Sequence, residues 1–210
     1  MPAFAPYLLF FVISGACGLA YEVVWTRLLG LAIGHTTVAL SAVVAAYMGG
    51  LAAGSAAIGR LLRTGRAPLL VYALLEAGVG LLALLFPIQL TLVTSLSAQS
   101  GLLFERGSLT LAGVRFVLAL VAVFPATVLM GGTLPAMLDA VPARDERSVA
   151  RTAGLLYAVN TAGAVAGAGL AGFVLIEWLG TFETTWLAAA GNLLVAGEGR
   201  AIGEARWSRP

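Results

Sequence analysis

Charge is scarce in this chain, and lysine is missing altogether. Only 10% of the 210 residues are charged, and all 12 basic residues are arginine. A soluble domain usually has about 25% charged residues. The 60% hydrophobic content therefore indicates that the protein is surrounded by lipid, not water. The net charge of +2 gives no reason to expect a nucleic-acid partner.

Cysteine and histidine each occur once, as Cys17 and His35. A single cysteine excludes an internal disulfide and any multi-cysteine metal site. His35 has no second histidine or cysteine close to it in sequence, so we expect a surface residue. The sequence contains no Ser-His-Asp order, no Walker A loop and no G-x-G-x-x-G motif after a strand. We therefore predict no catalytic residue, no metal and no cofactor in this chain.

Long apolar segments cover almost the whole chain. A helix needs about 20 residues to cross the hydrocarbon layer, and the N-terminus lacks the features of a removable signal peptide. We predict an all-α integral membrane protein, with one transmembrane domain over residues 1–197 and a polar cytoplasmic tail at 198–210. The six predicted transmembrane helices are 7–30, 37–59, 68–90, 109–131, 152–176 and 179–197.

Arginine gathers in two of the predicted connections, 60–66 and 143–151. Short arginine-rich loops stay in the cytoplasm. The tail, with Arg200, Arg206 and Arg209, falls on the same side. Both termini are therefore predicted to lie inside. The absence of lysine is typical of a GC-rich genome, so the expected location is the inner membrane of a bacterium.

Proline and glycine predict where these helices deviate from straight rods. Pro87 and Pro125 lie inside spans and predict kinks. The segment 131–135 reads Gly-Gly-Thr-Leu-Pro and is expected to break or bend the cytoplasmic end of the fourth span.

Spans two and five resemble each other in their small-residue texture, at 47–54 and 157–164. Each is the middle helix of a three-span half, which fits the inverted three-plus-three repeat of many transporters. The alternative is that any two Gly- and Ala-rich helices look similar. Small residues four apart also predict close helix packing, within the bundle in preference to a dimer interface. These residues are Gly50 and Gly54, and Gly163, Gly167 and Ala171.

Glu22 is the most informative single residue, because it lies inside the first span. A carboxylate there costs about 2.5–3.5 kcal/mol on insertion scales and usually faces a partner or a watery cavity. Gly18 and Thr26 share its helix face, so that face is expected to meet other helices. Tyr21 and Trp25 form the adjacent face.

Counting residues from the helix ends places the other polar residues at two levels. Arg115 is predicted at the level of Glu22, where an ion pair would lower the cost of both charges. That pair could be functional or could only fix helix packing. Glu76 and Asn160 share a lower level, and Tyr47 could bridge the two.

A cavity with two carboxylates and several aromatic faces suits a cation, since each aromatic face adds about 0.5–2 kcal/mol. The same carboxylates could instead carry protons, and Glu76 could simply be solvated near the headgroups. The predicted substrate-binding residues are Glu22, Tyr21, Trp25, Tyr47, Glu76 and Asn160, with Arg115 as the counter-ion of Glu22.

Four ordered motifs resemble the membrane domain of bacterial fused major-facilitator/spermidine-synthase proteins, over about residues 8–195. They are SGACGLAYEVVWTR at 14–27, YMGGLAAGS at 47–55, MGGTLP at 130–135 and LYAVNTAGA at 156–164. The loop at 59–66 also resembles the basic loop between helices two and three of major-facilitator transporters, without its acidic residue. The resemblance implies a six-helix, major-facilitator-like half bundle.

Members of that family commonly continue into a soluble aminopropyltransferase domain, which has a glycine-rich nucleotide loop and acidic residues for the polyamine. Neither feature is present before Pro210, and the Gly- and Arg-rich tail is consistent with a truncated reading frame. The resemblance thus implies a polyamine-linked membrane module that binds or transports a cationic solute. Its alternatives are the membrane part of a spermidine synthase with a separate catalytic domain, and a structural anchor without a ligand site. The implied partners are the lipid bilayer, a polyamine, a second copy of the chain or a separate synthase domain.

Overall fold

The computed structural model describes residues 5–34, 37–62, 67–105, 107–141 and 146–207. In this part of the chain all regular structure is helical, and no strand occurs. Five helical stretches are long and apolar enough to cross a membrane, which indicates a multi-pass membrane protein. His35, Arg63, Arg66, Arg106, Arg144 and Arg209 lie outside the described residues.

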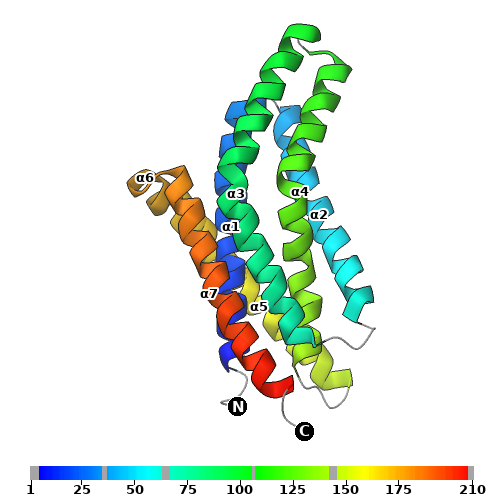
Figure 1. Cartoon of the computed structure of the whole chain (residues 1–210), viewed down its shortest axis with the longest axis vertical. Helices are drawn as coiled ribbons and strands as arrows, with labels where there is room; N and C mark the ends of the chain where they lie inside the picture. The colour runs from blue at the N-terminus through cyan, green and yellow to red at the C-terminus, as the bar shows by residue number, and fades with distance from the viewer. Residues whose placement is uncertain (1–4, 35–36, 63–66, 106, 142–145, 208–210) are drawn as a thin grey trace.

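The helices run alternately up and down and place both chain ends at the same end of the bundle (Figure 1). Helix α2 packs on α4, α5 packs on α1, and α7 packs on α3 and α1. The helices are α1 (Ala5–Ile33), α2 (Thr37–Leu62), α3 (Pro68–Leu103), α4 (Leu109–Ala140), α5 (Glu146–Leu170) with a π-helical turn (Ala171–Leu175) and α6 (Ile176–Trp178), and α7 (Thr181–Trp207).

The hairpin of α3 and α4 projects beyond the other helices (Figure 1). The predicted span ended at residue 90, whereas α3 continues to Leu103, about 20 Å further at 1.5 Å per residue. Hydroxyl groups in this extension bond to carbonyls one turn earlier, as Thr91 does to Pro87 and Thr94 to Leu90. These bonds satisfy the hydroxyl groups locally, so the polar residues continue the helix and do not end it.

The predicted break after Gly131 does not occur, because α4 is continuous to Ala140. Gly131 and Gly132 instead let α2 approach closely: a Cβ at Gly131 would collide with the backbone of Leu51, and one at Gly132 would press on Ile58. The glycines here are used for helix contact, not for a turn.

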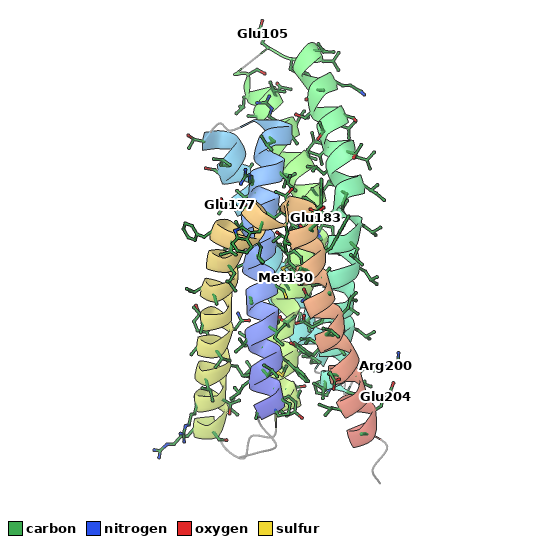
Figure 2. The ribbon with its side chains drawn as sticks, turned by 90° about the vertical axis from the view of Figure 1, so that its left-hand side faces the viewer. Glu105, Met130, Glu177, Glu183, Arg200 and Glu204 are labelled. Atoms are coloured by element: carbon green, nitrogen blue, oxygen red, sulfur yellow. The ribbon has the colours of Figure 1, made fainter. Side chains whose placement is uncertain are left out.

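Helix α7 also differs from the prediction, since it extends to Trp207 and includes most of the expected tail. Gly203 packs closely on Leu70 of α3, and Arg200 forms an ion pair with Glu204 one turn later, at 2.7 Å. Figure 2 shows this pair at the end of the bundle opposite Glu105. Unlike the other long helices, α7 does not combine the length and hydropathy of a membrane span.

The small-residue seams pack inside the bundle, as predicted. A Cβ at Gly54 would collide with the backbone of Val128 in α4, and a Cβ at Gly163 would collide with that of Val12 in α1. A Cβ at Gly167 would collide with the backbone of Ala16 in α1, and a Cβ at Gly50 would collide with the side chain of Thr127 in α4. These contacts bring the helix backbones together and leave a cavity with several polar residues, lined by α1, α2, α3, α4, α5 and α7.

Candidate functional site

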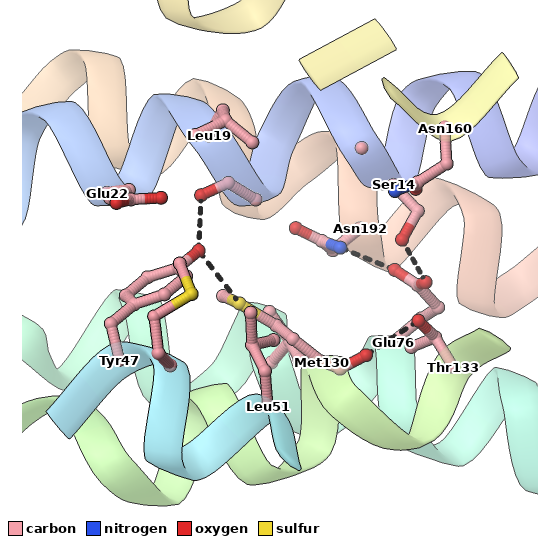
Figure 3. Close-up of a pocket in the computed structure, with 14 residues that line it drawn as sticks. Ser14, Leu19, Glu22, Tyr47, Leu51, Glu76, Met130, Thr133, Asn160 and Asn192 are labelled. Carbon is pink, nitrogen blue, oxygen red and sulfur yellow. Dashed lines mark hydrogen bonds between the residues drawn. The ribbon is translucent and has the colours of Figure 1, made fainter. Parts of the chain in front are cut away.

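Glu76 is completely buried at one end of this cavity (Figure 3). The hydroxyl group of Ser14 donates a hydrogen bond of 2.6 Å to its Oε1 atom, and the amide nitrogen of Asn192 donates one of 2.5 Å to its Oε2 atom. The hydroxyl group of Tyr72 lies beside the same carboxyl group but makes no well-formed hydrogen bond. A buried carboxyl group thus joins α1, α3 and α7.

The network continues from Asn192 to Tyr21. The phenol of Tyr21 donates a hydrogen bond of 2.7 Å to Oδ1 of Asn192, which fixes the orientation of the amide and directs its nitrogen toward Glu76. Tyr21 in turn stacks on Trp25 with ring centroids 4.9 Å apart, and Trp25 stacks on Phe86 at 4.8 Å. Packing and hydrogen bonds therefore hold this amide rigidly.

The cavity measures about 160 Å³. One water molecule needs about 10–15 Å³ of such space, so the cavity has room for several water molecules or a slender solute. Glu22 and Tyr47 lie at one end and Glu76 at the other (Figure 3). The lining consists of Ser14, Gly15, Gly18, Leu19, Glu22, Tyr47, Met48, Leu51, Glu76, Val79, Met130, Thr133, Asn160 and Asn192.

Tyr47 closes the side of the cavity near Glu22. Its hydroxyl group donates a hydrogen bond of 2.8 Å to the backbone oxygen of Gly18 and lies 3.5 Å from the sulfur of Met130. A Cβ at Gly18 would lie 4.0 Å from that hydroxyl oxygen.

The structure brings four of the six predicted binding residues into one cavity: Glu22, Tyr47, Glu76 and Asn160. Tyr21 and Trp25 do not line it, since both are at most 1% exposed and belong to the aromatic stack behind Asn192. Whether the four residues bind a solute stays a prediction.

The predicted ion pair between Glu22 and Arg115 is wrong. The side chain of Arg115 in α4 lies beside the C-terminal end of α1, where its Nη1 atom would be 3.6 Å from a Cβ on Gly34. Gly34 is 12 residues beyond Glu22, or about 18 Å along the helix at 1.5 Å per residue. The counting failed because α3 and α4 project past α1, so the start of α4 does not mark the level at which α1 ends.

Ser14 and Asn192 are functional candidates that the sequence prediction missed. Both bond directly to Glu76 and line the cavity. The signal for Asn192 was present, because an amide inside an apolar helix needs a partner just as Asn160 does. Ser14 had no comparable signal, since a serine hydroxyl can bond within its own helix.

The described residues include no cluster of histidine, cysteine, aspartate or glutamate that could hold a metal ion. The carboxyl groups of Glu22 and Glu76 belong to opposite ends of the cavity (Figure 3).

Comparison with family models, curated proteins and solved structures found no match to this chain.

Proposed function

We propose that this chain is a membrane module that binds, and in a complete assembly transports, a cationic polyamine-like solute. The observation that carries the proposal is the cavity with Glu76 buried at one end and Glu22 at the other. Ser14, which bonds to Glu76, and Glu22 lie eight residues apart on α1, or about 12 Å. That spacing suits an elongated solute with a positive charge near each end.

The composition of the lining supports a cation. It includes two carboxyl groups and no basic residue among its 14 members. Carboxylate oxygens can each accept two hydrogen bonds, so Glu76 keeps acceptor capacity beside its bonds from Ser14 and Asn192. Tyr47 is the remaining aromatic residue for a cation–π contact, since Tyr21 and Trp25 lie in the aromatic stack. At about 160 Å³ the cavity is smaller than the 300–1,000 Å³ typical of drug-sized ligands.

We further propose a six-span half bundle of the major-facilitator type, in a bacterial inner membrane, with both termini inside. In this arrangement α7 is the sixth span, and its charged end with Arg200 and Glu204 emerges in the cytoplasm. The position of both chain ends at one end of the bundle supports an even number of crossings (Figure 1).

An inverted repeat relates α1, α2 and α3 to α4, α5 and α7 in this proposal. Two constant shifts in residue number support it. A shift of 116 residues takes α1 onto α4, and a shift of 109 residues takes α2 onto α5. The second shift differs by one residue from the pairing predicted between 47–54 and 157–164. The two shifts superpose three pairs of close contacts. The contact of Gly15 with Asn160 corresponds to that of Gly131 with Leu51. The contact of Val12 with Gly163 corresponds to that of Val128 with Gly54, and the contact of Ala16 with Gly167 corresponds to that of Gly132 with Ile58.

A second copy of the chain would complete the site. The partly exposed residues of the lining, such as Leu19, Glu22, Met48 and Leu51, come mainly from α1 and α2. The cavity therefore opens on the side of the bundle that a second copy would have to cover in order to keep Glu22 away from lipid.

Helices α2 and α5 also carry exposed stripes of small residues four apart, on the faces turned away from the internal seams. Such stripes let helices of two molecules approach closely. The same shift of 109 residues relates four members of one stripe to the other. The stripes are Ser41, Ala45, Gly49, Ala53 and Ala57 on α2, and Gly154, Ala158, Ala162 and Ala166 on α5.

Two other functions stay open as proposals. The family resemblance favours the membrane part of a spermidine synthase, and a synthase domain encoded directly downstream would support it. A purely structural anchor would have no ligand at all. Uptake of radiolabelled spermidine into vesicles separates transport from both alternatives.

The binding test compares the parent protein with Glu22→Gln and Glu76→Gln by equilibrium dialysis of radiolabelled spermidine. We expect each variant to bind at least about tenfold more weakly, because one charged hydrogen bond is lost. Glu177→Gln is the matched control, since Glu177 is exposed and lies outside the cavity. Unchanged binding in both cavity variants, or no binding by the parent, would contradict the proposal.

A further inference from the structure

A second, larger hollow lies near the other end of α1, separate from the cavity around Glu76. It measures about 620 Å³ and is bounded by the end of α1 and the projecting hairpin of α3 and α4. Its walls are mostly apolar, with Leu31, Ile33, Leu102 and Leu111 among them. Arg115 provides the one positive charge in this lining.

Arg115 has no counter-ion in the described part of the chain. The ion pair in the described part of the chain joins Arg200 to Glu204, at the other end of the bundle. The Nε atom of Arg115 is buried without a hydrogen-bond partner. A buried guanidinium donor that has lost its water and gained no acceptor is costly. The side chain is therefore ready to receive an anion from outside the chain.

We propose that this groove binds the anionic phosphate headgroup of a membrane lipid, with Arg115 as the phosphate ligand. The guanidinium group offers several N–H donors in a fork that matches two phosphate oxygens. A phosphodiester headgroup would accept hydrogen bonds from the guanidinium group and neutralise its charge.

The depth of Arg115 selects a lipid over a soluble anion. Its guanidinium group lies beside Gly34, whose φ of +102° ends α1, and α2 begins shortly after at Thr37. In this proposal the ends of these two helices lie at the membrane surface, which places Arg115 at the level of the headgroups. The apolar walls, including Leu31 with 67% exposure, then accommodate the upper part of an acyl chain, which a free phosphate would leave uncovered.

Native mass spectrometry of the full chain in detergent tests the site, with phosphatidylglycerol as the anionic probe and phosphatidylcholine as the zwitterionic one. We expect the parent to bind phosphatidylglycerol at least about tenfold more tightly than phosphatidylcholine, and Arg115→Gln to lose that preference. Arg27→Gln is the matched control, because Arg27 is an exposed arginine near the same end of α1 and does not line the groove. Equal affinity of the parent for both lipids would overturn the proposal.

A second variant keeps the test independent of the charge. Gly101 lines the groove and a Cβ there meets nothing within 4 Å, so Gly101→Leu fills the groove without disturbing the fold. It should lower phosphatidylglycerol binding, whereas Gly113→Leu, at an open position outside the groove, should not. Unchanged binding in Gly101→Leu, or full competition by millimolar inorganic phosphate, would contradict a lipid site.

Discussion

The side-chain amide of Asn192 donates a hydrogen bond to the carboxyl group of Glu76, across 116 residues of sequence. Both residues are at most 2% exposed, and the bond joins α3 to α7. The partners depend on each other, since Glu76 loses one of its two donors without Asn192. This mutual dependence makes the pair a suitable place to test the fold.

Replacing Asn192 with leucine should destabilise the protein by about 1.5–3 kcal/mol, because a hydrogen bond to a buried carboxyl group is lost. Leucine restores most of the volume, so the effect reports the polar contacts of Asn192, which include the hydrogen bond donated by Tyr21. Unfolding in mixed detergent micelles measures it. In the Glu76→Leu background the same replacement should cost much less, and equal costs in both backgrounds would show that the two residues are not coupled.

Replacing Gly163 with alanine should also destabilise the bundle, by about 1–3 kcal/mol, because the added methyl group collides with the backbone of Val12. Gly169→Ala is the matched control on the same helix, where a Cβ meets nothing within 4 Å. The control should be neutral or slightly stabilising, since alanine favours helix. Thermal melts of both variants decide the matter, and equal melting temperatures would argue against close packing of α5 on α1.

The hydroxyl group of Tyr47 can be tested by its removal. Tyr47→Phe should cost about 0.5–1.5 kcal/mol, because the bond to the backbone oxygen of Gly18 is lost. Tyr157→Phe removes a hydroxyl group from a side chain that is 64% exposed and should have no effect. The same unfolding assay compares the two, and a silent Tyr47→Phe would mean that this bond does not hold α2 against α1.

Self-association through the exposed stripes predicts specific cross-links. Cys17 is the one native cysteine and is buried, so an introduced thiol can be assigned without ambiguity. Ala53→Cys and Ala162→Cys should give covalent dimers in membranes with a short thiol cross-linker. Val117→Cys, on the exposed surface of α4, is the control and should stay monomeric. Dimers from the control alone would place the contact on another face.

Much of the helical pattern could be predicted from the sequence, because long apolar segments separated by arginine-rich or glycine-containing connections leave few alternatives. Glu76 and Asn160, which were predicted at one level, both line the cavity. Helix α3 begins at its predicted start, whereas α5 begins at Glu146, six residues before the predicted start at 152.

The predictions failed where the position or role of a residue depends on a neighbouring helix. Arg115 was matched to Glu22 because no sequence pattern indicated that α3 and α4 extend past α1. The segment 131–135 was expected to break or bend α4, but the helix is continuous and the missing side chain at Gly131 lets α2 approach closely. Ser14 could not be selected in advance, because its role depends on a carboxyl group 62 residues away.

The most direct measurement of the central claim is thiol labelling inside the cavity. Leu51→Cys in a Cys17→Ala background places one thiol in the lining, and its reaction is followed with a cationic and an anionic methanethiosulfonate of similar size. We predict faster labelling by the cationic reagent, protection by spermidine, and loss of the charge preference in Glu22→Gln. No labelling at all, or equal rates for the two reagents with no protection by spermidine, would contradict a cation-binding cavity.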